Sequence, residues 1–208
     1  FVANRRRDHD LHQRSNVYVV DVDSGRVTAV SDGDDGMFIA PAWSTDGSAI
    51  VAIGGRFPRA GYRSGIWRFA ADGSEARGGT DLLADSDLMP GSGMNSDVAV
   101  GAPPRLAVSA GGRVRFSAPI EGSYELWEVP LEGGEIERLT GDRHYLSWWD
   151  TSADGGILAA VRASATSFPE VHAARLDDGA GSAPARARPA LHRVSTLNEQ
   201  LDSEVQWV

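Results

Sequence analysis

The chain has 208 residues, of which 41% are hydrophobic, and no apolar run approaches the roughly 18 residues of a membrane span. Its formal net charge of −9 at pH 7 argues against a nucleic-acid surface, which would show clustered positive charge. Cysteine is absent, which excludes disulfides, thiol catalysis and thiolate metal sites.

Four short strand patterns with a ring residue at the centre recur along the chain, and their rings are Tyr18, Trp67, Trp127 and His172. An acidic residue follows five positions after each ring, and glycine comes one or two positions later, which is the composition of a tight hairpin turn. Three copies place a hydroxyl residue thirteen positions after the ring: Ser31, Thr80 and Thr140. The fourth copy breaks this rule because an insertion rich in Ala, Pro and Arg intervenes at 180–189.

A second hairpin pattern lies between these strands. Its fullest copy spans residues 41–52, and weaker copies span 106–114 and 149–157. Each is again a strand, a polar turn with glycine, and a strand, so every repeating unit holds two hairpins, or four strands. The rings at 18, 67, 127 and 172 are 49, 60 and 45 residues apart, and the longest interval contains a Gly/Ser/Pro-rich loop at 81–104.

This repeat predicts an all-β protein, a partial β-propeller of about four four-stranded antiparallel blades, since one such blade takes roughly 40–50 residues. A β-sandwich is the alternative, but it has no reason to repeat two-hairpin units in register. The sequence begins at Phe1 inside a strand pattern, so we expect residues before it. The predicted propeller covers 1–195, with blades near 1–31, 37–80, 104–140 and 145–195, followed by a connector at 196–208.

The segment at 40–48, Ala-Pro-Ala-Trp-Ser-Thr-Asp-Gly-Ser, resembles the WD40-like PD40 repeat, with Thr45 where the repeat usually has proline. Such repeats occur in TolB-like propellers and in the propellers of prolyl-oligopeptidase-family serine peptidases. The wider chain is similar to the acylaminoacyl-peptidase and dipeptidyl-peptidase branch of that family. The segments that carry this similarity, in order, are 1–5, 16–21, 95–97, 126–140 and 197–201.

This resemblance implies a propeller that caps an active site and admits short peptides, with the catalytic Ser, Asp and His later in the parent chain. The expected partners are then a peptide substrate and an α/β-hydrolase domain. A TolB-like propeller that acts as a protein-interaction platform is the alternative. Because blades bury their faces against neighbours, a partial ring also predicts self-association through its open blade faces.

The chain offers no catalytic machinery of its own. A nucleophile elbow needs Gly-x-Ser-x-Gly, which is absent, and His172 stands at a ring position where packing is expected. The acidic run at 32–36 lacks the closing carboxylate of a calcium loop, so we predict no metal site and no cofactor. Asp46 and Gly47 are adjacent, unlike in a sialidase Asp box, and Asp46 is expected to bond amides of its own turn.

Four loop residues are candidates for contact with a peptide substrate, by loop position alone: Arg63, Asn95, Asp97 and Arg143. Ala99 stands where a polar or basic residue would be expected after the Asn-Ser-Asp segment. Ordinary solvated loop residues are the alternative interpretation of all four.

Overall fold

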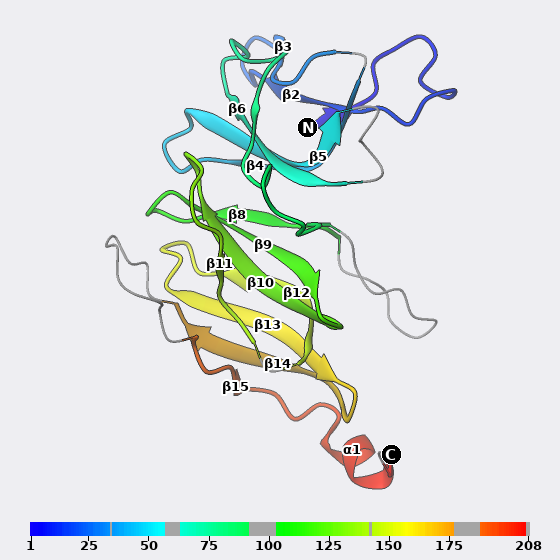
Figure 1. Cartoon of the computed structure of the whole chain (residues 1–208), viewed down its shortest axis with the longest axis vertical. Coiled ribbons are helices and arrows are strands. Elements are labelled where there is room, and N and C mark those ends of the chain that lie inside the picture. Colours follow the sequence, from blue (N-terminus) through cyan, green and yellow to red (C-terminus); the bar gives the residue numbers. More distant parts are fainter. Residues whose placement is uncertain (34, 57–62, 92–102, 142, 177–187, 207–208) are drawn as a thin grey trace.

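The structure is a computed structural model that describes residues 1–33, 35–56, 63–91, 103–141, 143–176 and 188–206. Fifteen short strands and one six-residue helix form its regular structure. The strands form three hydrogen-bonded sheets, of three, four and eight strands. The eight-stranded one consists of two antiparallel sets joined by one parallel pair, so four antiparallel sets, called the first to fourth sheets below, follow one another along the long axis of the molecule (Figure 1).

The first sheet holds β1 (Val2–Ala3), β2 (Asn16–Val20) and β3 (Val27–Ala29). The second holds β4 (Gly36–Trp43), β5 (Ala49–Arg56), β6 (Gly65–Ala70) and β7 (Thr80–Asp81). The third holds β8 (Leu106–Val108), β9 (Arg113–Ile120), β10 (Ser123–Pro130) and β11 (Glu137–Arg138). The fourth holds β12 (Tyr145–Thr151), β13 (Ile157–Ser164), β14 (Ser167–Arg175) and β15 (His192–Arg193), and α1 (Glu199–Glu204) follows it.

Each sheet is a meander, because consecutive strands in it pair antiparallel. The third and fourth sheets are also joined by a single parallel pair between Tyr124 of β10 and Tyr145 of β12. Three of the four predicted acidic-plus-glycine turns are present, and Gly25, Gly73 and Gly133 take the positive φ values of 68°, 81° and 84° that such turns require. The fourth, at Asp177 and Gly179, lies outside the described residues.

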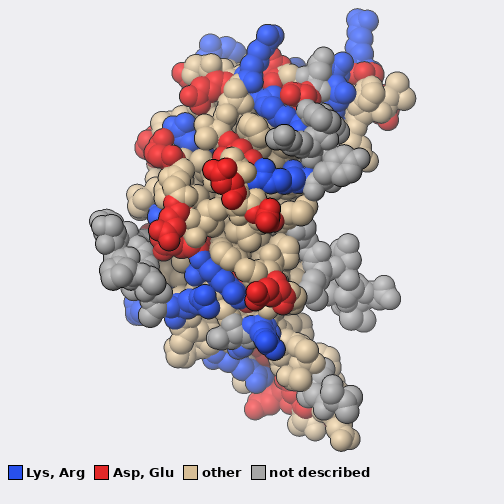
Figure 2. Space-filling model, in the orientation of Figure 1, with Lys and Arg blue, Asp and Glu red and all other residues tan. Residues whose placement is uncertain are grey.

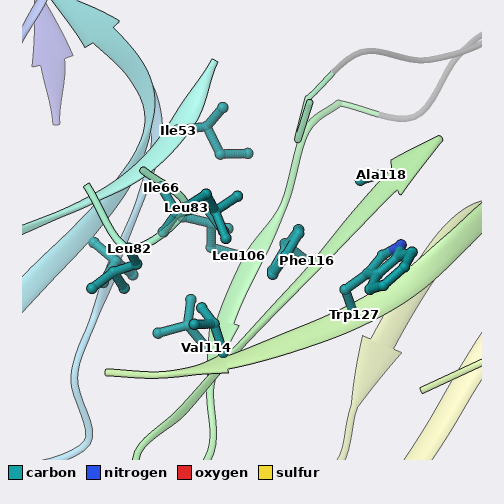
Figure 3. Close-up of a cluster of buried hydrophobic side chains, with 11 residues drawn as sticks. Ile53, Ile66, Leu82, Leu83, Leu106, Val114, Phe116, Ala118 and Trp127 are labelled. Atoms are coloured by element: carbon teal, nitrogen blue, oxygen red, sulfur yellow. The ribbon is translucent and has the colours of Figure 1, made fainter. Parts of the chain in front are cut away.

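Three apolar clusters fill the spaces between successive sheets. Val17, Phe38 and Phe69 belong to the cluster between the first and second sheets. Figure 3 shows the cluster between the second and third sheets, to which Ile53 and Ile66 of the second sheet and Phe116 of the third belong. A third cluster, with Leu126 and Leu158, lies between the third and fourth sheets.

Burial along the strands follows their place in the stack. In β5 and in β10 the first seven of eight residues are buried, because both strands have a sheet on either side. In β13 the pattern alternates at its start, with Leu158 buried and Ile157 exposed, since only one side of the fourth sheet is covered. The outward residues of β13 are nevertheless apolar, which is typical of a face built to be covered.

Candidate functional site

A polar clasp repeats near the start of β2, β10 and β14. In the first sheet, Ser31 Oγ accepts the N–H of Val17 at 2.9 Å and donates to Asn16 Oδ1 at 3.1 Å. In the third sheet, Thr140 Oγ1 accepts the N–H of Leu126 at 2.9 Å and donates to Glu125 Oε2 at 2.6 Å. The hydroxyl at thirteen positions after the ring therefore ties the returning chain to the strand.

The fourth sheet has the same clasp, but sequence spacing missed it. Ser195 accepts the N–H of Val171 at 2.9 Å and donates to the carboxylate of Glu170. The insertion that broke the spacing rule lies between His172 and Ser195 in the sequence. The Ser195 hydroxyl nevertheless occupies the place that Ser31 and Thr140 occupy in their sheets. A search for a hydroxyl beyond the insertion would have found it.

The second sheet departs from the pattern. Thr80 lies in β7, where it pairs with Arg68 of β6 and is exposed, so it does not act as a clasp. The clasp partner position holds Gly65, and Asp81 Oδ1 lies 2.3 Å from where a Cβ of that glycine would be. Asp81 instead accepts the N–H of Leu83 at 3.0 Å, so a carboxylate holds this turn without a hydroxyl.

Arg63, a predicted substrate contact, is directed at its own chain. Its guanidinium lies 3.4 Å from Asp81 Oδ2 and donates to the carbonyls of Ala84 at 3.1 Å and Ser86 at 2.9 Å, and also to that of Leu83. These bonds hold the turn that follows β7. A role of Arg63 in substrate contact stays a prediction.

The other three candidate residues are placed differently. Arg143 is exposed in the loop before β12, at a φ of 53°. Asn95 and Asp97 lie outside the described residues. The substrate-facing assignment of all four residues remains a prediction.

Beside Arg143 is a buried polar cluster centred on Glu125, whose side chain is fully buried. Arg138 Nη2 lies 3.2 Å from its Oε1, and His144 Nε2 lies 3.1 Å from its Oε2. Burial raises the pKa of Glu125, but the hydrogen bonds from His144 and Thr140 outweigh it, so the pKa is lowered and the carboxylate is ionised. The cluster fixes residues 138–144 on β10, which is a structural role.

The turn of the PD40-like segment is held by its own carboxylate, as predicted. Asp46 Oδ1 accepts the N–H of Ser48 at 3.0 Å and the hydroxyl of Ser44 at 2.6 Å. The hydrogen bonds from Ser44 and Ser48 lower the pKa of Asp46 to about 2. The same turn recurs in the fourth sheet, where Asp154 accepts from Ser152 at 2.5 Å.

The sequence did not predict a pocket of about 230 Å³ between the first and second sheets. Pro41 and Trp43 of the PD40-like segment line it, together with Phe1, Tyr18 and Val20. The rings of Phe1 and Tyr18 are stacked with centroids 5.4 Å apart, and Trp43 is 51% exposed.

Among the described residues, no group of three or more His, Asp or Glu side chains could hold a metal ion. The same part of the chain contains no helix long and apolar enough to cross a membrane. Figure 2 shows acidic and basic side chains lying beside one another on the face in view. The ion pair of Arg68 with Glu132 connects the second sheet to the third.

Comparison with known proteins relates this chain to peptidases. No family model matches it. It is 28% identical over 157 residues to dipeptidyl-peptidase 5 of Porphyromonas gingivalis, which covers 75% of this chain and 20% of that protein. The acylaminoacyl peptidase of Pyrococcus horikoshii is similar in structure, with a TM-score of 0.59, 17% identity, and coverage of 93% of this chain and 25% of that one.

Two further solved structures share the fold. Dipeptidyl peptidase 4 of Porphyromonas gingivalis has a TM-score of 0.58 at 14% identity, over 93% of this chain and 24% of that one. TolB of Acinetobacter baumannii has a TM-score of 0.56 at 19% identity, over 79% of this chain and 36% of that one. The predicted all-β propeller fold and the resemblance to propellers of these serine peptidases are confirmed, while the number of blades and the domain boundaries remain predictions.

Proposed function

Because this chain is similar to the propeller domains of prolyl-oligopeptidase-family peptidases and spans only a fifth of its curated relative, we propose that it is a non-catalytic propeller segment of such a peptidase. In this role it gates the access of short peptides to an α/β-hydrolase domain elsewhere in the parent protein. The observation that carries the proposal is the 28% identity to dipeptidyl-peptidase 5 over three quarters of the chain.

The most direct experiment is to sequence the coding region beyond Val208. A hydrolase domain with a Gly-x-Ser-x-Gly elbow is expected there. An open reading frame that ends without such a domain would overturn the proposal.

The purified chain provides a second experiment. It is expected not to hydrolyse chromogenic dipeptidyl or acylaminoacyl substrates. Turnover that a serine-directed inhibitor abolishes would place the nucleophile within these 208 residues and would contradict a non-catalytic role.

A TolB-like interaction platform is the second candidate, and the likeness to TolB of Acinetobacter baumannii favours it. That likeness supports the fold alone, since the two chains are 19% identical. A downstream sequence without a hydrolase domain, together with capture of a defined protein partner by the purified chain, would favour this candidate over the peptidase.

We also propose that the open faces at the two ends of the stack associate with a second copy of this chain. Ile157 on the fourth sheet is 45% exposed, and Val20 on the first sheet is likewise 45% exposed. The three internal interfaces already pack one such face on the next, so a second copy would continue the same arrangement.

Light scattering after size exclusion tests this association. The chain is expected to elute as a dimer, and Ile157→Arg is expected to yield monomers because it places a charge on the apolar face. Leu11→Arg is the matched control, since Leu11 is 74% exposed in a loop of the first sheet, and it should leave the dimer intact. A monomeric native chain would refute the proposal.

A further inference from the structure

The segment after β15 folds back onto the start of β14. Glu170, which is 4% exposed, lies at the centre of this contact. Its carboxylate accepts the backbone N–H of Asn198 at 2.6 Å, the guanidinium of Arg193 at 3.1 Å, and the hydroxyl of Ser195. One buried carboxylate thus holds Arg193 of β15 and two residues that follow the fourth sheet, Ser195 and Asn198.

Two further hydrogen bonds fasten the same segment. The Asn198 side-chain amide donates to the carbonyl of Pro169 at 2.7 Å. The backbone N–H of Phe168 donates to Asp202 Oδ1 of α1 at 3.1 Å. Burial raises the pKa of Glu170, but the hydrogen bonds from Ser195, Asn198 and Leu197 and the charge of Arg193 outweigh it and lower the pKa to about 2, so the acceptor is ionised.

In the first and third sheets, the residue before the clasp partner makes a hydrogen bond to the chain that begins the next sheet. In the first sheet, Ser15 donates its N–H to the carbonyl of Gly36, the first residue of β4, at 3.1 Å. In the third sheet, Tyr124 donates its N–H to the carbonyl of His144, just before β12, at 3.0 Å. In both cases the residue that precedes the clasp partner binds the strand that opens the next sheet.

The fourth sheet cannot make this bond. The residue that precedes its clasp partner is Pro169, which has no N–H to donate. Its carbonyl instead accepts from Asn198, so residues 195–204 lie where the next sheet would begin.

From this substitution of contacts, we propose that Glu170 is a positioning residue that latches residues 195–204 to the corner of the fourth sheet. Within the described residues, the chain therefore turns away from the stack of sheets at this point. The latch fixes the direction in which the following chain departs. This inference deepens the proposed function only in that these residues overlap the expected connector to the hydrolase domain.

Hydrogen exchange followed by mass spectrometry tests the latch in the full chain. Glu170→Gln removes the charge and one acceptor, so the peptide that contains Asn198 is expected to exchange at least about tenfold faster, the scale of a lost charge-assisted hydrogen bond. Peptides from β9 and β10 are expected to keep their protection. The matched control is Glu125→Gln, which removes the equivalent clasp carboxylate in the third sheet and should leave residues 195–204 unchanged.

Three results would overturn the latch. The first is unchanged exchange at Asn198 in Glu170→Gln, and the second is equally faster exchange of residues 195–204 in Glu170→Gln and Glu125→Gln. The third is loss of protection throughout the chain in Glu170→Gln, combined with unchanged protection of residues 195–204 in Asn198→Ala. Asn198→Ala removes only the bond to Pro169 and retains the fold of the sheet, so it reports on the latch even where Glu170→Gln misfolds. None of these readouts needs peptidase activity. A missing downstream hydrolase domain would therefore overturn the proposed function and leave the latch standing.

Discussion

A buried ion pair within the third sheet includes Arg115, whose guanidinium also binds the fourth sheet, and removal of this pair should strongly destabilise the chain. Arg115 and Glu128 have side chains that are each 1% exposed, and Arg115 Nε lies 3.3 Å from Glu128 Oε2. Arg115 Nη1 also donates to the carbonyl of Gly155 in the fourth sheet at 2.6 Å. Arg113 Nε binds the other oxygen of Glu128 at 3.0 Å.

The cost of each substitution follows from which charges stay behind. Glu128→Gln leaves two guanidiniums without their shared carboxylate, one of them fully buried, and should reduce the free energy of unfolding by about 3–5 kcal/mol. Arg115→Met leaves Glu128 paired with Arg113 and mainly strands the Gly155 carbonyl, which costs about 1–3 kcal/mol. The double variant Arg115→Met with Glu128→Leu should be more stable than Glu128→Gln, because no buried charge remains uncompensated there.

Urea unfolding followed by circular dichroism measures these changes. Glu132→Gln is the control, since Glu132 is 75% exposed in its ion pair with Arg68 and its loss should cost less than about 1 kcal/mol. The reasoning is refuted by a Glu128→Gln variant that loses under about 1 kcal/mol, or by one that is more stable than Arg115→Met.

Three further changes test other parts of the structure. Gly73→Ala should destabilise the chain more than Gly47→Ala in thermal unfolding. Both glycines have positive φ, but only at Gly73 would a Cβ meet a backbone atom, the carbonyl oxygen of Ala29 at 2.5 Å. Equal losses of stability in the two variants would contradict this. Burial lowers the pKa of His172 from its usual 6.5, so the unfolded chain takes up the proton first and the free energy of unfolding falls as the pH drops below 6.5. His172→Phe should remove that loss of stability, and a pH profile of stability that the substitution leaves unchanged would count against this reasoning. The pKa of Glu170 is about 2 in the folded chain against its usual 4.5, so Glu170 stabilises the fold fully above pH 4.5 and loses this contribution as the pH falls toward 2. Glu170→Gln should therefore make stability fall less steeply with acidification. An equally steep fall in the variant and the native chain would contradict the lowered pKa.

The parts of the fold that the sequence predicted are those set by local chemistry. Acidic-plus-glycine turns and the clasps of Ser31 and Thr140 depend on residues within one hairpin, so their spacing is visible in the sequence. Thr80 failed as a clasp because the second sheet pairs Trp67 with Asp81, a register that spacing alone does not specify.

Contacts between sheets were beyond the reach of the sequence. The Arg115 bond to Gly155 joins residues 40 positions apart, and although Gly155 lies in a recurring turn, no pattern marks Arg115 as its partner. Ser195 was hidden by the length of the insertion before it, and the pocket beside Trp43 depends on how the first and second sheets face each other. Such features follow from the packing of whole sheets, which strand patterns do not determine.

An experimental structure of the 208-residue chain is the most direct test of the stacked-sheet architecture. The four strand sets are expected to lie face to face in sequence order, with the Arg115 guanidinium bound to the Gly155 carbonyl of the next sheet. Two sheets closed on each other as a sandwich, with Arg115 and Gly155 apart, would contradict both the propeller and the peptidase role proposed from it.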